Sequence, residues 1–187
     1  MGARVLARAH RRGGSTYRAA LVCRAESPLQ LSQLGGTTAA WVDRDSVGGY
    51  LLAAAFLKLK KLDPERTFRT ELFAGSYSAA VELLLSGKAD VTSVYAPPGP
   101  AHSGPSGIDE IVPGRKSHVA VVAYTDESPN DGVALGMSQS VEATELLGRA
   151  LTTLHTTTSG KRLLAALFNA ERFELAPRLS YRALYRV

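Results

Sequence analysis

The feature that most constrains the fold is a strand-like segment that leads through a short loop into an amphipathic helix. Residues 37–42 are rich in β-branched and apolar residues, which is typical of a strand. Between Tyr50 and Lys61, apolar residues recur at spacings of three and four, which predicts a helix with one apolar face. A unit of strand, loop and helix favours the α/β class of folds, in which helices cover a sheet.

The same alternation continues along the rest of the chain. Strands are expected over residues 16–24, 68–73, 90–95, 119–124 and 133–137. Helices are expected over residues 76–86, 139–155 and 159–169, with a short helical turn over residues 29–34. A proline-rich loop is expected over residues 96–107 and a turn over residues 128–132. This order predicts an α/β fold with a mostly parallel sheet flanked by helices.

The basic character of the chain is concentrated near its N-terminus. The formal net charge is +5, and five arginines precede the first acidic residue, Glu26. These arginines are Arg4, Arg8, Arg11, Arg12 and Arg18. No helix-turn-helix pattern and no basic stripe with interleaved aromatic residues follows them, and basic charge alone supports only nonspecific attraction to nucleic acid. We therefore do not expect nucleic acid to be a partner.

Cysteine and histidine usage argues against a metal centre. Cys23 is the only cysteine and lies in an apolar run, where a buried, unreactive side chain is expected. The four histidines, at positions 10, 102, 118 and 155, do not have the spacing of zinc ligands. We therefore expect neither a metal nor a cofactor.

Hydropathy gives no sign of a membrane segment. No stretch approaches the ~20 apolar residues that a membrane-spanning helix requires. Residues 1–14 are basic, like the first part of a signal peptide, but the apolar core of about 7–15 residues does not follow. The residues themselves therefore predict neither a membrane span nor an export leader.

The loop Asp43–Gly49 is the strongest candidate for a binding site. The first N–H groups of a helix have no partners within the helix, and the peptide dipoles leave partial positive charge there. Such an end can hold a phosphate, phosphonate or sulfate group. Ser46 can cap the helix or donate to an anion, and Gly48 and Gly49 either let a ligand approach the backbone or only form the turn. The segment lacks the GxxxxGK[ST] pattern, so nucleoside triphosphate hydrolysis is not expected.

A second junction, Phe73–Ser78, again combines a strand end, small residues, a hydroxyl group and a helix start. Two helix starts at the same edge of a parallel sheet converge on one crevice, which is where open α/β sheets bind ligands. Ser76 and Tyr77 are therefore further candidates. Tyr77 can donate its phenol there or pack with its hydroxyl group in water.

The junctions resemble those of the phosphate, phosphite and phosphonate substrate-binding proteins of ABC transporters, which have the type 2 periplasmic-binding-protein fold. The run Leu34–Leu51 is similar to that family's strand, Ser-x-Ser-Gly-Tyr anion loop and helix. Further matches in the family's order and spacing are Leu62–Pro64, Phe73–Ser76, Ala79–Val81, Gly87–Asp90 and, at the return to the hinge, Glu127–Asp131. The similarity extends from about Thr16 to Tyr185.

The resemblance implies which residues contact the ligand. Ser46, the amides of Val47 and Gly48, and Tyr50 would surround the oxyanion, and Asp131 would lie near the hinge side of the cleft. The complete set of candidate ligand-binding residues is Asp45, Ser46, Val47, Gly48, Tyr50, Ser76, Tyr77, Tyr95 and Asp131.

Three positions depart from the family pattern. Gly48 stands where the family's anion loop has its second serine, and Tyr77 stands where the family usually has a histidine. The residues Ala96–Pro98 stand where aminophosphonate binders place a carboxylate for the ligand amine. The resemblance therefore implies a plain or differently substituted oxyanion rather than an aminoalkyl phosphonate.

The resemblance also implies a domain organisation with an incomplete first lobe, because family members carry a longer segment ahead of the matching stretch. Residues 1–24 are expected to form an N-terminal arm and hinge strand, and residues 25–125 an α/β second lobe with the anion loop. Residues 126–187 would form the hinge return and the C-terminal helices of the first lobe. The exposed hinge edge could pair with a second copy to give a homodimer.

The expected function is that of a solute-binding protein that feeds a phosphate- or phosphonate-like oxyanion to an ABC permease, with an extracytoplasmic location implied by the resemblance. One alternative is a sensory or regulatory domain of the same fold that dimerises or pairs with a partner chain. An enzyme on this scaffold, such as a transferase or a pyrimidine-precursor synthase, would need a nucleophile or a cofactor lysine in the crevice. The chain has no GxSxG or HExxH motif, and its lysines are expected at helix ends and turns, so an enzyme is not expected.

Overall fold

The computed structural model describes residues 3–11, 14–99 and 107–177 of the chain. The described residues divide into two compact units, which are unit 1 (residues 3–11, 14–17 and 128–177) and unit 2 (residues 18–99 and 107–127). The chain passes from one unit to the other after Tyr17 and returns after Glu127. Each unit has its own sheet and its own apolar core.

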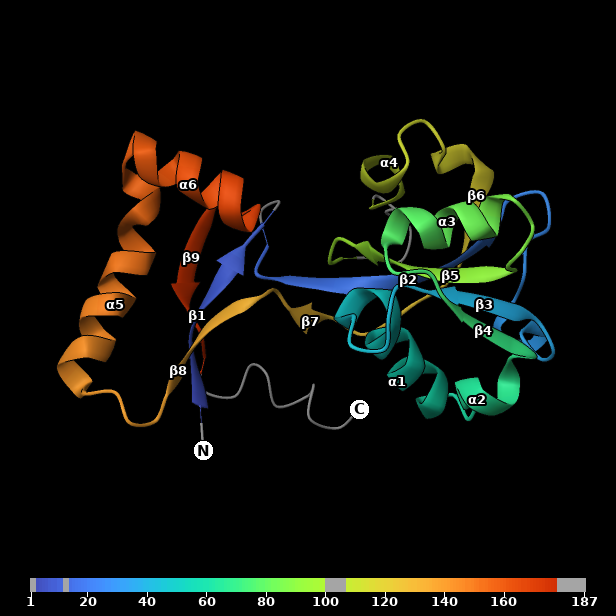
Figure 1. Cartoon of the computed structure of the whole chain (residues 1–187), viewed down its shortest axis with the longest axis horizontal. Helices are drawn as coiled ribbons and strands as arrows, with labels where there is room; N and C mark the ends of the chain where they lie inside the picture. Colours follow the sequence, from blue (N-terminus) through green and yellow to red (C-terminus); the bar gives the residue numbers. More distant parts are fainter. Residues whose placement is uncertain (1–2, 12–13, 100–106, 178–187) are drawn as a thin grey trace. The chain divides into compact units, whose positions relative to one another are not determined.

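Unit 2 is an α/β layer structure built on a sheet with the strand order β4-β3-β5-β2-β6 (Figure 1). Its strands are β2 (Thr16–Arg24), β3 (Thr38–Trp41), β4 (Thr70–Phe73), β5 (Val91–Ala96) and β6 (Val119–Tyr124). Its helical segments are η1 (Leu31–Gln33), η2 (Val47–Leu51), α1 (Leu52–Leu59), α2 (Pro64–Thr67), α3 (Tyr77–Leu85), α4 (Gly107–Ile111) and η3 (Lys116–His118). The α/β fold class is thereby confirmed.

The sheet of unit 2 is mixed, which corrects the expectation of a mostly parallel sheet. Strand β3 pairs in parallel with β4 and β5, and helices connect these three strands in sequence. Strand β2 pairs antiparallel with β5 and with β6. The spacing of apolar residues indicates which segments are strands, but the pairing direction depends on which strands lie side by side in space.

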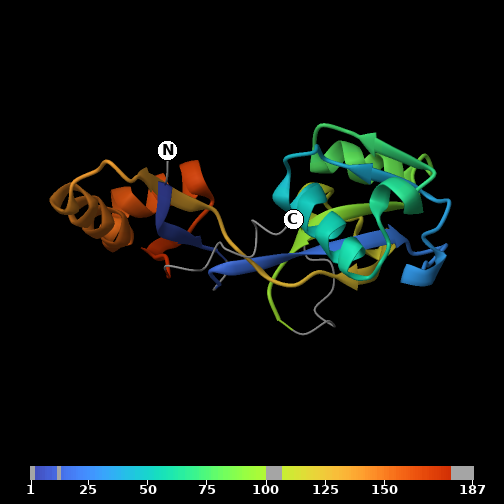
Figure 2. The same ribbon diagram turned by 90° about the horizontal axis from the view of Figure 1, so that it is seen from below.

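Both faces of this sheet are buried, because successive side chains of a strand point to opposite faces. In β2, Leu21 and Cys23 pack with Leu57 of α1, whereas Ala20 and Val22 pack with residues of α3 and α4. Helices α1 and α2 lie on one face of the sheet and α3 and α4 on the other (Figures 1 and 2). The sheet is thus the middle layer of three, and its strand ends determine where the loops of the site lie.

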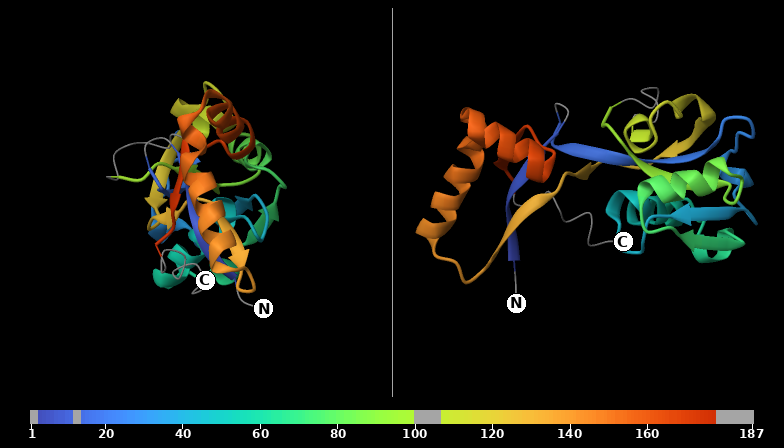
Figure 3. Two further views of the ribbon diagram at one scale, coloured as in Figure 1. Left: turned by 90° about the vertical axis from the view of Figure 1, so that its left-hand side faces the viewer. Right: turned by 45° about the horizontal axis from the view of Figure 1, so that its top comes forward.

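Unit 1 is a smaller α/β unit with a three-stranded antiparallel sheet in the order β8-β1-β9. Its elements are β1 (Ala3–His10), β7 (Ser128–Pro129), β8 (Gly132–Gly136), α5 (Val141–Thr153), η4 (Leu154–Thr156), α6 (Thr158–Phe168) and β9 (Arg172–Leu175). Helix α5 packs against β9 and β1, and lies in front of the strands in the left view of Figure 3. Leu164 and Phe173 form the core of this unit with three buried alanines.

Three strands were not expected from the sequence. Strand β1 occupies residues that were expected to form part of an N-terminal arm, and β9 follows the last predicted helix. Strand β7 pairs with the first residues of β2, where a turn was expected. These segments are short or rich in alanine and arginine, so their local pattern is weak. Pairing of β1 with β8 and β9, and of β7 with β2, decides their structure.

The starts of three predicted helices are confirmed to within two residues, because side-chain caps mark them locally. The hydroxyl groups of Ser76, Ser140 and Thr157 accept hydrogen bonds from backbone amides in the first turns of α3, α5 and α6. Asn169 ends α6 in the left-handed conformation, with φ of 45°. Within the described residues, no helix combines the length and the apolar composition that crossing a bilayer requires.

Candidate functional site

The candidate site begins where β3 ends in unit 2. The loop Asp43–Ser46 leaves the sheet, and the Asp43 carboxylate accepts a hydrogen bond of 2.9 Å from the amide of Asp45. The helix that follows starts at Val47 rather than at Tyr50 as expected. Its first five residues form a π-helical turn that continues into α1. The helix N-terminus therefore lies within the predicted anion loop Asp43–Gly49, whose last three residues are helical.

Ser46 caps this helix. Its hydroxyl oxygen accepts a hydrogen bond of 3.2 Å from the amide of Gly49, and its carbonyl oxygen accepts bonds of 3.0 Å from the amides of Tyr50 and Leu51. No acceptor in the described part of the chain lies within hydrogen-bond distance of the amides of Val47 and Gly48. Two backbone donors at a helix N-terminus are therefore available to an anion.

The two glycines of the loop have different structural roles. A Cβ atom on Gly49 would lie 2.4 Å from Cγ2 of Val42 and 2.7 Å from the hydroxyl oxygen of Ser46. Gly49 is thus required for packing of the helix start against Val42, and ligand approach to its backbone stays a prediction. The carbonyl oxygen of Gly48 accepts a bond of 2.7 Å from the buried Ser93 hydroxyl of β5. This bond fixes the first helical turn against the sheet.

The second predicted junction lies at the same edge of the sheet as the first. Strands β3 and β4 are parallel, and the residues that follow β4 bond to the end of β3. The amide of Ala74 donates to the carbonyl oxygen of Trp41, and the amide of Gly75 to that of Val42, both at 2.8 Å. The expectation that the starts of the two helices lie at one edge of the sheet is confirmed.

Ser76 caps helix α3 at this second junction. Its hydroxyl oxygen accepts a bond of 3.2 Å from the amide of Ala79 and lies 3.1 Å from the hydroxyl oxygen of Ser78. The ring of Tyr77 contacts the ring of Tyr95, at the end of β5, with 5.4 Å between centroids. The structure thus places these three candidates, Ser76, Tyr77 and Tyr95, at the carboxyl ends of the parallel strands.

The hydroxyl group of Tyr95 donates a hydrogen bond of 2.8 Å to the carboxylate of Glu110, on helix α4. Sequence reasoning found no carboxylate here, because it examined only the residues that directly follow Tyr95. Glu110 comes 15 positions later in the chain. Tyr95 and Glu110 meet only because α4 packs onto β5, and no local sequence pattern predicts this contact.

Tyr50 lies in an aromatic cluster beside the first junction. Its ring contacts Phe73 of β4 and Trp41 of β3, with centroids 5.4 and 5.6 Å apart respectively. Burial, followed by the charge of Glu71, raises the pKa of Tyr50 above its ordinary value, and the guanidinium of Arg44 opposes this shift. Tyr50 is therefore a neutral hydroxyl donor at physiological pH.

Arg44 and Phe73 are site residues that the sequence analysis did not select. The guanidinium carbon of Arg44 lies 4.6 Å from the centroid of the Phe73 ring, in a cation–π contact. The sequence signal was present, since Arg44 lies inside the predicted anion loop. Its flanking acids, Asp43 and Asp45, obscured this signal.

Asp131 belongs to unit 1, whereas the other eight candidates belong to unit 2. Its carboxylate forms an ion pair of 2.7 Å with Arg11, which also donates to the carbonyl oxygen of Phe168 at the end of α6. Asp131 lines a pocket of about 410 Å³ within unit 1, together with apolar residues such as Leu167. Its ligand role stays a prediction.

No group of three or more histidine, cysteine, aspartate or glutamate residues in the described ranges has the arrangement of a metal site. The edge of the sheet in unit 2 carries hydrogen-bond donors, namely backbone amides and hydroxyl groups. Donors of this kind suit a small anion.

Comparisons with known proteins found a matching family model. A family model described as "ABC transporter, phosphonate, periplasmic substrate-binding protein" matches residues 1–181. A comparison with curated proteins found no match.

Solved structures of type 2 periplasmic binding proteins have a similar fold. A Xanthomonas citri protein bound to ATP has a TM-score of 0.80 and 20% identity, covering 98% of this chain and 69% of that chain. The binding protein of a phosphonate ABC transporter from Pseudomonas aeruginosa has a TM-score of 0.74 and 17% identity, covering 98% and 61%. PhnD1 from Prochlorococcus marinus, in complex with methylphosphonate, has a TM-score of 0.71 and 20% identity, covering 98% and 69%. The present chain thus spans between 61% and 69% of the length of these structures.

Proposed function

Because the chain belongs to the phosphonate substrate-binding protein family of ABC transporters, we propose that it binds a phosphate- or phosphonate-like oxyanion at the N-terminus of the η2–α1 helix. The family implies a small ligand and an ABC permease as partners. Its members bind and deliver solutes for transport, and we propose that this chain likewise performs no catalysis.

The observation that carries this proposal is the pair of backbone amides of Val47 and Gly48, which have no acceptor among the described residues. They lie at the positive end of a helix dipole, beside the Ser46 hydroxyl group. The cap uses a lone pair of the Ser46 oxygen and not its proton, so the hydroxyl group remains a donor. Three donors from consecutive residues can thus contact one tetrahedral group.

The neighbouring junction supports the same ligand class. The first turn of α3 begins at the same edge of the sheet, and Tyr50 and Tyr77 each add a phenol. The ligands named for two similar structures, methylphosphonate and ATP, both carry tetrahedral phosphorus oxyanions. We propose inorganic phosphate, phosphite or a simple alkylphosphonate for this chain, with Asp45 and Tyr95 as contacts to any further part of the ligand.

Isothermal titration calorimetry with phosphate, phosphite, methylphosphonate and sulfate tests the proposal. The decisive variant is Ser46→Ala, and Ser140→Ala is its matched control. Ser140 caps α5 in unit 1 with the same geometry, at 3.1 Å from the amide of Ala143. Each substitution is expected to lower the stability of its unit by about 1 kcal/mol, because each removes a helix cap.

Only Ser46→Ala is expected to weaken anion binding. A hydrogen bond to a charged group contributes about 1.5–3 kcal/mol, which corresponds to a loss of roughly 10- to 100-fold in affinity. If no oxyanion gives heat at millimolar concentration, or if the two variants bind with equal affinity, the proposed site is wrong.

For the larger organisation, we propose that residues 25–125 form the second lobe of the two-lobed fold. Residues 1–24 would supply the arm and hinge strand, and residues 126–187 the hinge return and the C-terminal helices of the first lobe. In this arrangement the anion loop belongs entirely to the second lobe. Delivery to a permease would then follow the family pattern.

We also propose that the chain forms a homodimer through unit 1. Six exposed large apolar side chains lie in this unit, namely Met137, Val141, Leu146, Leu163, Leu167 and Leu175. Exposed large apolar side chains on one unit are candidates for contacts with a second copy. Sedimentation velocity of the purified chain tests this oligomeric state.

A further inference from the structure

We propose that Arg44 is a specificity-determining residue, because its guanidinium is held over Phe73 beside the anion loop and contacts the bound oxyanion there. This inference rests on the proposed function, since it assigns a cation to the same site. It also names the ligand class more narrowly, as a doubly charged oxyanion rather than a singly charged one.

The position of Arg44 follows from the register of the sheet. Trp41 pairs with Phe73 across the parallel strands β3 and β4, so the residues just after Trp41 lie next to the ring of Phe73. The guanidinium carbon is 4.6 Å from the centroid of that ring, and the ring is 36% exposed. A planar cation stacked on an aromatic face loses little further side-chain freedom when it binds a ligand.

Arg44 has no competing acid. Within the described ranges, no carboxylate lies within ion-pair distance of its guanidinium. By contrast, Arg8, Arg11 and Arg24 each pair with an acid, at distances of 2.7, 2.7 and 3.5 Å in turn. A fork of N–H donors with no acid paired to it matches the geometry of a phosphorus oxyanion.

The charge of Arg44 reaches the residues that are proposed to bind the ligand. The phenol of Tyr50 responds to the guanidinium, which lowers the pKa of that phenol against the larger effects of burial and Glu71. The rings of Tyr50 and Phe73 contact each other, so Arg44, Phe73 and Tyr50 form one group at the helix N-terminus. One cation in this group complements the backbone amides of Val47 and Gly48.

The flanking acids explain why this cation decides specificity. Asp43 and Asp45 are exposed on either side of Arg44, and the carboxylate of Asp43 bonds to the loop backbone. Without Arg44, the only charged side chains of the loop Asp43–Ser46 would be acidic, and they would repel an anion. A guanidinium in direct contact attracts a dianion more strongly than a monoanion, so it favours phosphate, phosphite and sulfate dianions.

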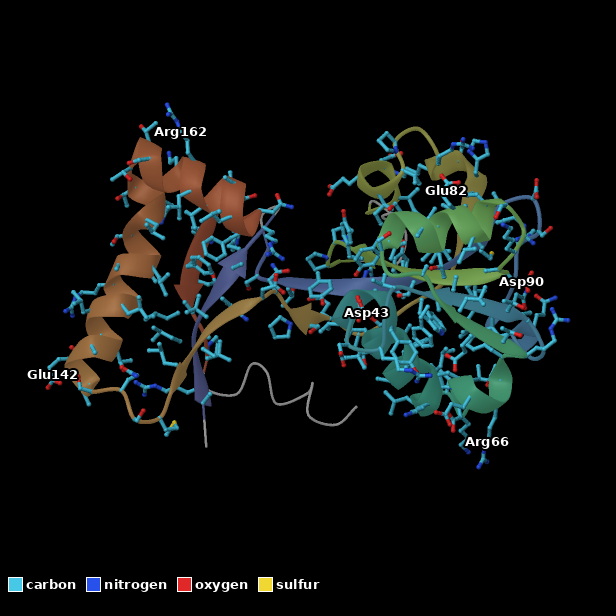
Figure 4. All side chains as sticks on the ribbon, in the orientation of Figure 1. Asp43, Arg66, Glu82, Asp90, Glu142 and Arg162 are labelled. Atoms are coloured by element: carbon cyan, nitrogen blue, oxygen red, sulfur yellow. The ribbon has the colours of Figure 1, made fainter. Side chains whose placement is uncertain are left out.

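The test compares Arg44→Gln with Arg66→Gln, measured by calorimetry against inorganic phosphate and methylphosphonate. Arg66 is a matched control, because it is an exposed arginine of the same unit that projects from α2 away from the sheet (Figure 4). Both variants lose one positive charge, but only Arg44→Gln removes the stacked guanidinium. We expect affinity to fall about tenfold for Arg44→Gln. Arg66→Gln is expected to stay within twofold of the parent.

A third variant, Arg44→Lys, separates geometry from charge. Lysine keeps the charge without the planar fork, so it should restore only part of the lost affinity. Raising the salt concentration should weaken oxyanion binding by the parent and by Arg66→Gln more than binding by Arg44→Gln. If the parent binds phosphate but Arg44→Gln and Arg66→Gln bind with equal affinity, the role of Arg44 is wrong while the proposed function stands. A parent chain that binds no oxyanion would instead refute the proposed function.

Discussion

Replacement of Gly49 by alanine is the sharpest test of how the helix N-terminus is built. A Cβ atom at this position would lie 2.4 Å from Cγ2 and 2.7 Å from Cβ of Val42. Nonbonded carbon atoms prefer separations of about 3.5–4.0 Å, so one side would have to move by about 1 Å. Val42 is 7% exposed and β-branched, so its side chain has little room and few rotamers.

The expected change in the free energy of unfolding combines two destabilising effects and one stabilising effect. Overpacking of a buried site costs about 1–3 kcal/mol. The new methyl group would also lie 2.7 Å from the Ser46 hydroxyl oxygen, and disturbing that cap costs about 1 kcal/mol. Alanine in place of glycine gains about 1 kcal/mol in helix propensity. We therefore expect Gly49→Ala to lower the free energy of unfolding of unit 2 by about 1–3 kcal/mol.

Gly148→Ala is the matched control, because Gly148 is also a helical glycine but has room for a methyl group. Its added Cβ would lie 3.5 Å from Leu175 and 3.6 Å from Leu6, which is ordinary contact. The propensity gain should then stabilise unit 1 by about 0.5–1 kcal/mol. Urea unfolding distinguishes the units, because Trp41 is the only tryptophan and lies buried in unit 2. Its fluorescence reports on unit 2, and circular dichroism reports on both units.

The expected result is a lower urea midpoint of the tryptophan transition for Gly49→Ala, together with weaker oxyanion binding. Gly148→Ala should leave the tryptophan transition in place and shift the remaining circular dichroism change to higher urea. If Gly49→Ala unfolds at the same urea concentration as the parent, close packing of the helix start against Val42 is not what requires glycine there.

Two further predictions concern Tyr50 and unit 1. An absorbance titration of the parent against Tyr50→Phe should reveal a phenol that ionises above pH 10.0, because burial and then Glu71 raise the pKa of Tyr50. The stabilisation that this phenol contributes is present below its unfolded pKa and is lost as the pH rises through the higher folded pKa. A difference spectrum that titrates below pH 10.0 would contradict the raised pKa of Tyr50. For the dimer, Leu146→Glu should weaken self-association at least tenfold in sedimentation velocity, whereas Leu59→Glu, at a leucine 75% exposed in unit 2, should not change it. A parent chain that sediments as a monomer at all concentrations would refute the dimer.

Sequence reasoning located the features that depend on near neighbours in the chain. Ser46 and Ser76 were recognisable as helix starts because a cap acts within three residues. The alternation of strands and helices likewise predicted the α/β fold class. The common edge of the two junctions also followed from sequence, because parallel strands joined by helices must end on the same side.

Local sequence patterns did not predict contacts between residues that are distant in the chain. The stacking of Arg44 on Phe73 requires the register of β3 against β4, which only the folded sheet fixes. The hydrogen bond from Tyr95 to Glu110 depends in the same way on where α4 docks. For Gly49, the sequence suggested ligand approach or a turn, whereas the contact that an added Cβ would make with Val42 is tertiary and could not be read from the sequence.

The two interpretations of Ser46, a helix cap and an anion donor, are compatible once the atoms are assigned. The cap needs a lone pair of the hydroxyl oxygen, which the amide of Gly49 occupies. The anion needs the hydroxyl proton, and the amides of Val47 and Gly48 lie just before the capped one. Capping also fixes the side-chain rotamer, so less side-chain entropy is lost on ligand binding. Threonine at position 46 should therefore preserve both roles, and Ser46→Thr should bind phosphate nearly as well as the parent while Ser46→Ala does not.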